Sequence, residues 1–327
     1  MMETLYNTWI IASKPDNIPI VGLMFLVIFF TYLALRLAVR NDRIRSKNEA
    51  DPDEGAGASK GQLVDVKDVV FDEAEQGLPA KVLTWPHLVK LELLVTLFMM
   101  VLLMVWSIPI DAPLEEMANP GLSPNPAKAP WYFLGLQDML VYFDPWIAGV
   151  LIPVVIIVGL MLIPYLDPNP KGSGYYTLKE RKAIIATFFF GFHILWILFI
   201  VIGTFLRGPG WMWFWPWETW DAHRVVSETN VNLNEFVGNL LGIEAIAAPK
   251  AAFAFGILAL GGYYALGCLL PYGYLRRQQS EILAKMGWIR YGTIAVLFWS
   301  MMGLPIKVFL NLFFHIKYIW VTPWFNI

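Results

Sequence analysis

The sequence predicts an all-α polytopic membrane protein with six transmembrane helices, and three observations lead to this fold class. The chain of 327 residues is 57% hydrophobic and 15% charged, whereas soluble domains are about 45–50% apolar and about 25% charged. Six apolar runs reach the length of about 20 residues that a helix needs to cross a bilayer. Lipid offers no hydrogen-bond partner to a free backbone amide, so each run is predicted to be helical.

The distribution of Lys and Arg predicts the orientation of these helices. The apolar runs cover residues 18–39, 88–109, 146–166, 184–206, 251–271 and 290–313. With the N-terminus outside, the inner loops hold 15 Lys and Arg residues and the outer segments hold 6. Because cytoplasmic loops carry the excess of positive charge, both termini are expected on the outer (periplasmic) side. A short amphipathic helix, introduced by Pro130, is expected in the outer loop before the third span.

The chain divides into five regions by composition. They are an N-terminal extra transmembrane helix (1–39), a cytoplasmic polar linker (40–86), a central domain (87–207), a Trp-rich periplasmic loop (208–250), and two further transmembrane helices with a periplasmic tail (251–327). Within the linker, residues 51–62 are rich in Gly, Ala and acids, which is typical of a flexible tether. Five Trp within residues 211–220 predict an aromatic belt at the membrane interface.

Residue counts limit the chemistry that the chain can perform alone. The single cysteine, Cys268, excludes an internal disulfide and a covalent CxxCH haem site. Haem b held by two histidines needs facing pairs, and the four histidines are scattered one to a region: His87, His193, His223 and His315. No metal motif, phosphate loop, nucleophile elbow or basic nucleic-acid-binding tract is present. The composition therefore predicts a polytopic membrane subunit without a haem or metal of its own.

One short segment adds a family resemblance. Residues 129–134, APWYFL, resemble the PEWYFL segment in the C-terminal half of cytochrome b and in subunit IV of the cytochrome b6f complex. The surroundings match in order: a Trp-Pro pair before the second span, a Pro-rich outer loop, and IPYLDPNP at 163–170. The resemblance covers about residues 80–207, so the second, third and fourth spans look like the family's helices E, F and G. The first span and the last two lie outside the three-helix pattern of subunit IV.

The resemblance implies a place for this segment in an outer quinol-oxidation site. In the family the short helix lines that site, so the quinone-binding residues would be Pro130, Trp131, Tyr132, Phe133 and Leu134. Proline suits the first helical turn, because its missing N–H costs nothing there. Aromatic rings with polar tips supply a flat apolar wall near the membrane surface. Tyr132 would hydrogen-bond the quinone or simply pack, and the Trp-rich loop is a second candidate for contact with a quinone or a partner.

The sequence departs from the family where the usual Glu, a proton acceptor, aligns with Pro130. Proline has no acid–base chemistry, so another base or a water chain must act. Asp138 lies eight residues on, about two helical turns away and on roughly the same side, and is the candidate acceptor. Its alternative role is a plain carboxylate near the helix end. Glu115 and Glu116 in the same loop are further candidates.

A second proton-carrying residue is suggested on the inner side. His87 begins the second span near Lys90 and Glu92, and imidazole titrates near neutral pH. By the resemblance, a cytochrome b partner would have its quinone-reduction site on that face, so His87 is a candidate for a proton relay. The alternative is an ordinary histidine at a helix start in the membrane interface.

The resulting hypothesis is a subunit IV-like part of a quinol:cytochrome c oxidoreductase of the bc1 or b6f type, which couples electron transport to proton translocation. No complete active site would lie in this chain alone. The quinone (menaquinone or ubiquinone) would be shared with a haem-bearing cytochrome b N-terminal subunit. Haem b, haem c and a 2Fe-2S cluster would belong to partners, namely that subunit, a c-type cytochrome and a Rieske protein. By analogy the complex is dimeric and lies in a bacterial-type inner membrane.

Two other functions follow from the same sequence. A purely structural membrane anchor of a respiratory or photosynthetic electron-transfer complex would explain the missing Glu at Pro130. A secondary transporter is disfavoured because few ionisable residues lie within the spans and no inverted repeat is visible.

Overall fold

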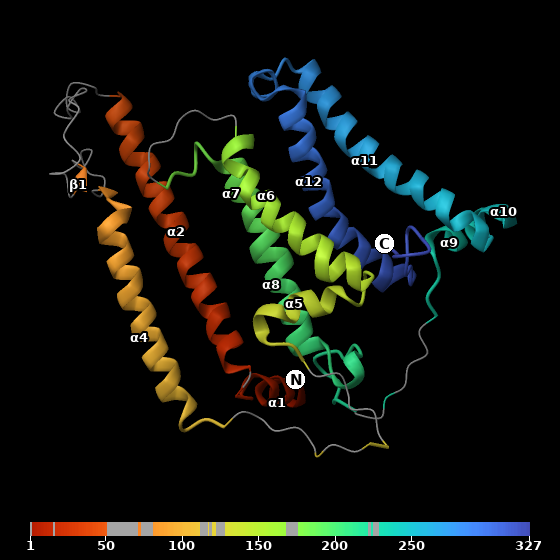
Figure 1. Cartoon of the computed structure of the whole chain (residues 1–327), viewed down its shortest axis with the longest axis horizontal. Helices are drawn as coiled ribbons and strands as arrows, with labels where there is room; N and C mark the ends of the chain where they lie inside the picture. The colour runs from red at the N-terminus through yellow and green to blue at the C-terminus, as the bar shows by residue number, and fades with distance from the viewer. Residues whose placement is uncertain are drawn as a thin grey trace. The chain divides into compact units, whose positions relative to one another are not determined.

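The computed structural model describes most of the chain and is built from long apolar helices (Figure 1). The described residues are 2–15, 17–50, 71–72, 81–111, 117, 120–121, 128–167, 176–221, 224 and 229–327. Within them, six helices are long and apolar enough to cross a membrane: Ile18–Ser46, Thr84–Ser107, Ile147–Leu166, Lys182–Leu206, Pro249–Arg277 and Leu283–Phe314. The predicted fold class and number of spans are confirmed, whereas the orientation of the termini stays a prediction.

In the described part of the chain, short and long helices follow one another, with one small strand pair. The α-helices are α1 (Met2–Ala12), α2 (Ile18–Ala50), α4 (Val89–Ser107), α5 (Trp131–Met139), α6 (Ile152–Leu166), α7 (Lys182–Phe188), α8 (Ile197–Val201), α9 (Leu233–Leu241), α10 (Glu244–Ala247), α11 (Ala252–Arg277) and α12 (Glu281–Phe314). The π-helical turns are Thr84–Leu88, Ile147–Leu151, Phe189–Trp196 and Ile202–Leu206, and the 3-10 turns are Pro209–Trp211 and Pro249–Ala251. Strands β1 (Phe71–Asp72) and β2 (Lys81–Val82) pair antiparallel.

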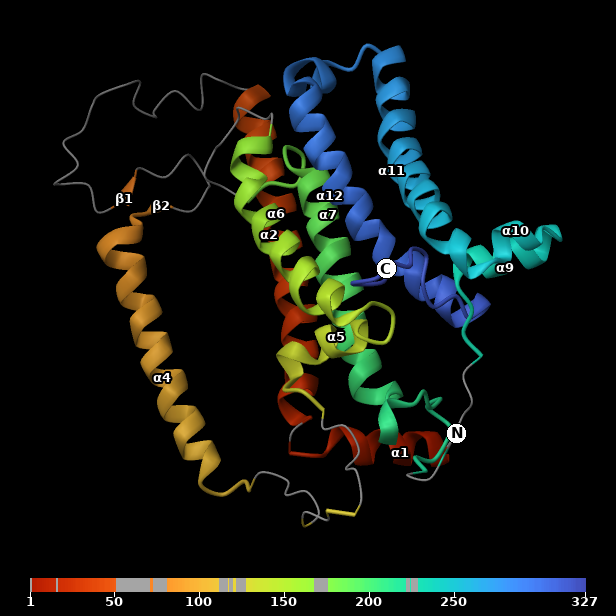
Figure 2. The ribbon, with the colours of Figure 1, turned by 45° about the vertical axis from the view of Figure 1, so that its right-hand side comes forward.

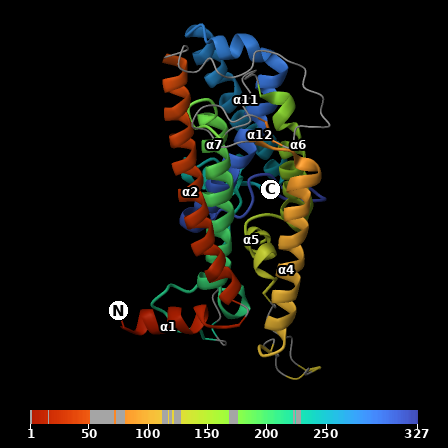
Figure 3. The same ribbon diagram turned by 90° about the vertical axis from the view of Figure 1, so that its left-hand side faces the viewer.

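The chain forms two compact units. The first contains residues 1–8, 123–170 and 189–327, and the second contains residues 9–122 and 171–188. In the second unit the C-terminal end of α2 is fastened beside the start of α7 (Figure 3). The carboxylate of Asp42 accepts hydrogen bonds from the backbone N–H groups of Leu178 and Lys179, at 3.1 and 3.0 Å. Arg45 pairs with Glu180 at 2.8 Å.

The structure differs from the sequence analysis at the predicted start of the linker. The linker was expected to begin at residue 40, but α2 continues to Ala50. Residues 40–50 are mostly good helix formers, such as Arg, Lys, Glu and Ala, and Asp42 and Arg45 hold them against residues 178–180. The tether proposed for residues 51–62 lies outside the described residues.

A second finding concerns residues 208–250, which the sequence analysis assigned to a Trp-rich periplasmic loop. The structure contains two further helices there, α9 and α10. A capping box explains where α9 begins, because Glu235 accepts a hydrogen bond from the backbone N–H of Asn232 at 3.4 Å. Gly242 ends α9 in the left-handed conformation, with φ of 69°.

In the first unit, α5 lies across the helix that ends at Leu206 (Figure 1). Small residues permit the close crossing. A Cβ atom added to Gly203 would lie 2.9 Å from Cγ of Leu134, and one added to Gly135 would lie 3.4 Å from Cβ of Phe199. The backbone of α5 therefore rests almost directly on its neighbour.

Because of this close crossing, we expect Gly203→Ala to destabilise the protein. Alanine is the better helix former by about 1 kcal/mol, yet here its methyl group would push α5 away, because Leu134 is buried. We expect a lower melting temperature of the purified protein complex in a thermal unfolding scan. The matched control is Gly149→Ala, where nothing lies within 4 Å of the added Cβ; it should leave stability unchanged or raise it. An unchanged melting temperature for Gly203→Ala would contradict the crossing.

Candidate functional site

The short helix α5 has one buried and one exposed side. Leu134, Gly135, Asp138 and Met139 are buried. The exposed fractions of Tyr132 and Phe133 are 49% and 54%, and their ring centroids are 4.8 Å apart. The helix thus presents adjacent aromatic rings outward and carries a carboxylate on its inner side.

The buried side contains an ion pair that joins α5 to the end of the fourth span. Arg207 Nε donates to Oδ1 of Asp138 at 2.9 Å, and Arg207 Nη2 donates to the hydroxyl of Tyr142 at 3.1 Å. The exposed fraction is 5% for Arg207 and 0% for Asp138. Oδ2 of Asp138 is buried and has no hydrogen-bond partner among the described residues. One carboxylate oxygen is therefore neutralised and the other is left without a donor.

A tight turn at the start of the Trp-rich loop encloses the guanidinium group. Residues 206–214 fold back on themselves, with an antiparallel bridge between Arg207 and Trp213. The guanidinium carbon lies 5.4 Å from the centroid of the Trp213 ring, and Nη1 donates to the carbonyl of Trp211 at 3.4 Å. Gly208 is required here, since an added Cβ would lie 2.5 Å from the ring of Phe214. This turn keeps water away from the ion pair.

Burial dominates the electrostatics of this cluster. Loss of solvation raises the pKa of Asp138 above its ordinary value, although the charge of Arg207 and the hydrogen bond from it act in the opposite direction. Loss of solvation, and then the charge of Asp138, raise the pKa of Tyr142 to about 12. The carboxylate is thus easier to protonate than a surface aspartate, and a raised pKa favours the role of a proton acceptor.

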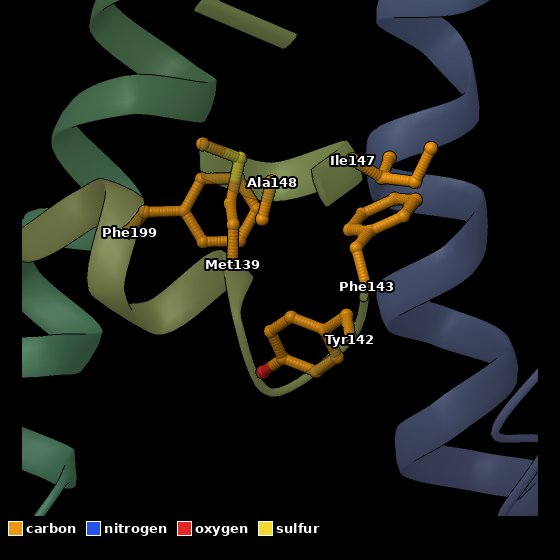
Figure 4. Close-up of a cluster of buried hydrophobic side chains, with 6 residues drawn as sticks. All are labelled: Met139, Tyr142, Phe143, Ile147, Ala148 and Phe199. Carbon is orange, nitrogen blue, oxygen red and sulfur yellow. The ribbon is translucent and has the colours of Figure 1, made fainter. Parts of the chain in front are cut away.

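An apolar core lies next to the charged cluster (Figure 4). It consists of Met139, Tyr142, Phe143, Ile147, Ala148 and Phe199. Figure 4 shows Phe143 and Ile147 directed toward α12, and Phe199 and Met139 gathered on the opposite side. Leu304 and Val308 of α12, with Phe325 and Ile327 of the C-terminal segment, pack against this core. The last span and the segment after it therefore complete the support of α5.

The structure changes the placement of several predicted residues. Pro130 is the capping residue before α5, with φ of −51° and ψ of 148°, and does not belong to its first turn. The expectation that Asp138 lies on the side of Pro130 is wrong, because Pro130 is exposed and Asp138 is fully buried. Leu134 also belongs to the buried side. Trp131 is partly buried, with its ring 5.6 Å from that of Tyr132.

Other candidates are only partly described. His87 is half-buried in the π-helical turn Thr84–Leu88 before α4, and its role as a relay stays a prediction. Glu115, Glu116 and His223 lie outside the described residues. In the part of the chain that the structure describes, no three His, Cys, Asp or Glu side chains gather in a way that would hold a metal ion.

Sequence reasoning missed Arg207 and Tyr142. Arg207 was counted only as an outer positive charge, although an arginine at the end of an apolar span, followed at once by Gly-Pro-Gly-Trp, is a recognisable signal. Its partner lies 69 residues earlier in the chain, and no local pattern connects the two positions.

Because the ion pair is buried, we expect loss of one partner to destabilise the protein more than loss of both. In Arg207→Met a buried carboxylate would lose its partner, which typically costs about 3–5 kcal/mol. The double variant Asp138→Leu with Arg207→Met removes both charges and should be markedly more stable than Arg207→Met alone. Thermal unfolding of the assembled complex measures both. Glu218→Gln is the control, because its ion pair with Arg224 is partly exposed to solvent and its loss should matter little. Equal destabilisation by the single and the double variant would argue against the pair.

Comparison with known families covers this cluster. Residues 117–214 match the family described as Cytochrome b(C-terminal)/b6/petD. The matched segment contains α5, Asp138, Tyr142 and Arg207. Comparisons with curated proteins and with solved structures gave no match. The chain is an integral multi-pass membrane protein, and its residues 117–214 are similar to the C-terminal cytochrome b, b6 and petD family.

Proposed function

We propose that this chain forms part of the outer quinol-oxidation site of a quinol:cytochrome c oxidoreductase of the bc1 or b6f type. It is the C-terminal, subunit IV-like component, and a haem-bearing cytochrome b N-terminal subunit completes the site. A Rieske protein and a c-type cytochrome accept and carry the electrons. Support comes from the family match over residues 117–214 and from the exposed aromatic side of α5 within it.

The aromatic side of α5 suits a quinol ring. Tyr132 and Phe133 are about half exposed and adjacent, so each offers a ring face or edge to a flat apolar ligand. The hydroxyl of Tyr132 supplies a polar tip that can hydrogen-bond the quinol oxygen. The close crossing at Gly203 holds this helix firmly, which keeps the rings in one orientation. The aromatic side of α5 therefore binds and orients the quinol ring.

The buried side of α5 supplies the proton acceptor. Pro130, which aligns with the family's usual Glu, has no acid–base group and cannot fill this role. Oxidation of a quinol releases two electrons and two protons. The electrons and one proton leave to the partner subunits, and Asp138 accepts the other proton. The observation that carries the assignment is the unpaired, buried Oδ2 of Asp138 beside its raised pKa. Asp138 is fully enclosed within this chain, so the quinol does not contact it directly and the proton is relayed to it. Arg207 keeps Oδ1 fixed at 2.9 Å and thereby directs protonation to the other oxygen.

The aromatic wall is tested by Tyr132→Ala and Phe133→Ala in the purified native complex. Both should strongly reduce quinol-dependent reduction of haem b and of the c-type acceptor while haem content stays unchanged, because they remove the ring surface and not the fold. Tyr165→Ala is the matched control, since Tyr165 is an exposed tyrosine on α6. Full turnover in both test variants would favour the structural anchor instead, a function for which the missing Glu at Pro130 already argues.

The proton acceptor is tested by the pH dependence of the same reaction. Asp138 accepts a proton only when it is ionised, so wild-type turnover should fall as pH drops through its raised pKa. Asp138→Asn keeps the side-chain shape and should abolish this acid limb, with a rate loss of about 10²–10⁴-fold. An unchanged pH profile with full haem content would eliminate Asp138 as the acceptor. A purely structural role would change stability but not the shape of the profile.

A further inference from the structure

Helix α9 packs against α10 through one polar and one small residue. Asn234 is buried, and its amide donates to the carbonyls of Ile246 and Ala248 at 3.0 and 3.2 Å. Gly238 is buried on the same side, where an added Cβ would lie 2.4 Å from the backbone nitrogen of Ala247. The helix is amphipathic, and the side it uses to contact α10 carries its small and polar residues. Its apolar side must therefore find another environment.

Apolar side chains at the end of α9 and just after it are exposed. The exposed fractions of Leu240, Leu241 and Ile243 are 73%, 59% and 44%. Helical spacing places Phe236 one turn before Leu240, and the ring of Phe236 lies 5.6 Å from that of Phe314 at the end of α12. Exposing these apolar side chains to water would be unfavourable in free energy, and α9 contributes little to the core that could offset it.

This surface is continuous with the lipid-facing surface of the last span. Phe309 and Phe313 of α12 are exposed by 50% and 68%, and their rings are 4.6 Å apart. They belong to a helix that is long and apolar enough to cross the membrane, so lipid is the solvent for these two rings. Because Phe236 touches Phe314 of the same helix, the apolar side of α9 continues the surface that lipid already covers.

The direction of α9 agrees with this placement. Figures 1 and 2 show α9 and α10 at one end of α11, and in Figure 2 they lie across it. The chain passes from α10 through the turn Pro249–Ala251 directly into the span. With nine residues, α9 is far too short to cross a bilayer. A helix lying across the end of a span lies in the plane of the membrane surface.

We propose that α9 and α10 form a membrane-interface hairpin whose exposed apolar residues, Leu240, Leu241 and Ile243, are seated in the lipid at the end of α11 and α12. An amphipathic helix of this type buries its apolar side about 5–10 Å into the boundary between headgroups and acyl chains. The exposed polar residues Asn239 and Glu244 then face the headgroups and water. The hairpin lies outside the matched family segment and is independent of the quinol site.

Spin labelling of the full chain within its complex in phosphatidylcholine vesicles tests this hairpin. In a Cys268→Ala background, a nitroxide is attached at Leu240→Cys or at Asn239→Cys, adjacent positions on different sides of α9. Leu258→Cys, an exposed position on α11, is the lipid-facing reference. Collision of each label with oxygen, which concentrates in lipid, is compared with collision with a water-soluble nickel chelate.

The expected result is loss of nickel collisions at position 240 with strong oxygen collisions, as at position 258, and strong nickel collisions at position 239. Equal nickel collisions at 239 and 240 would overturn the proposal, because the apolar side would then face water. A label at 240 that is immobilised and shielded from both reagents would also overturn it, and would identify a partner protein as the cover. Retained haem content in the labelled complexes shows that each variant has assembled.

Discussion

The ion pair between Asp138 and Arg207 is the constraint on which the rest of the first unit depends. Two opposite charges that are almost completely removed from water are tolerated only when they meet in good geometry. Meeting requires α5 to lie across the end of the fourth span, and that crossing requires glycine at position 203. It also requires the chain after Leu206 to fold back, so that Trp213 covers the guanidinium group. One electrostatic requirement thus sets the position of a helix and the shape of a turn.

The same arrangement separates two tasks on one short helix. The buried side of α5 holds the charge, and the exposed side offers aromatic rings. Because the charged side is held by Arg207 and by the core around Tyr142 and Phe199, the exposed side does not need to contribute to stability. Tyr132 and Phe133 can therefore remain exposed, which is the condition for a surface that a ligand or a partner subunit completes.

Segments outside the family match take part in this support. Leu304 and Val308 of α12 pack against the core next to the site, and the backbone N–H of Val231 donates to the carbonyl of His315, which ties the segment before α9 to the end of α12. Lys307 lies almost fully buried in the same region and donates to the carbonyl of Lys317. Helices α9 and α12 are therefore structural parts of the first unit. In the second unit, the hydrogen bonds to Asp42 hold α2 in a similar way.

The sequence by itself determined the membrane fold class, the six spans and the short helix after Pro130. The length and hydropathy of a run and the residues that start a helix can be read locally, and an apolar run in lipid must be helical. It also determined the family resemblance through APWYFL. Only the tertiary structure decided that Asp138 faces inward, that Arg207 is its partner, and that residues 233–247 form two helices with Asn234 buried against the second. These depend on contacts between residues up to 69 positions apart, where burial and charge pairing outweigh local periodicity.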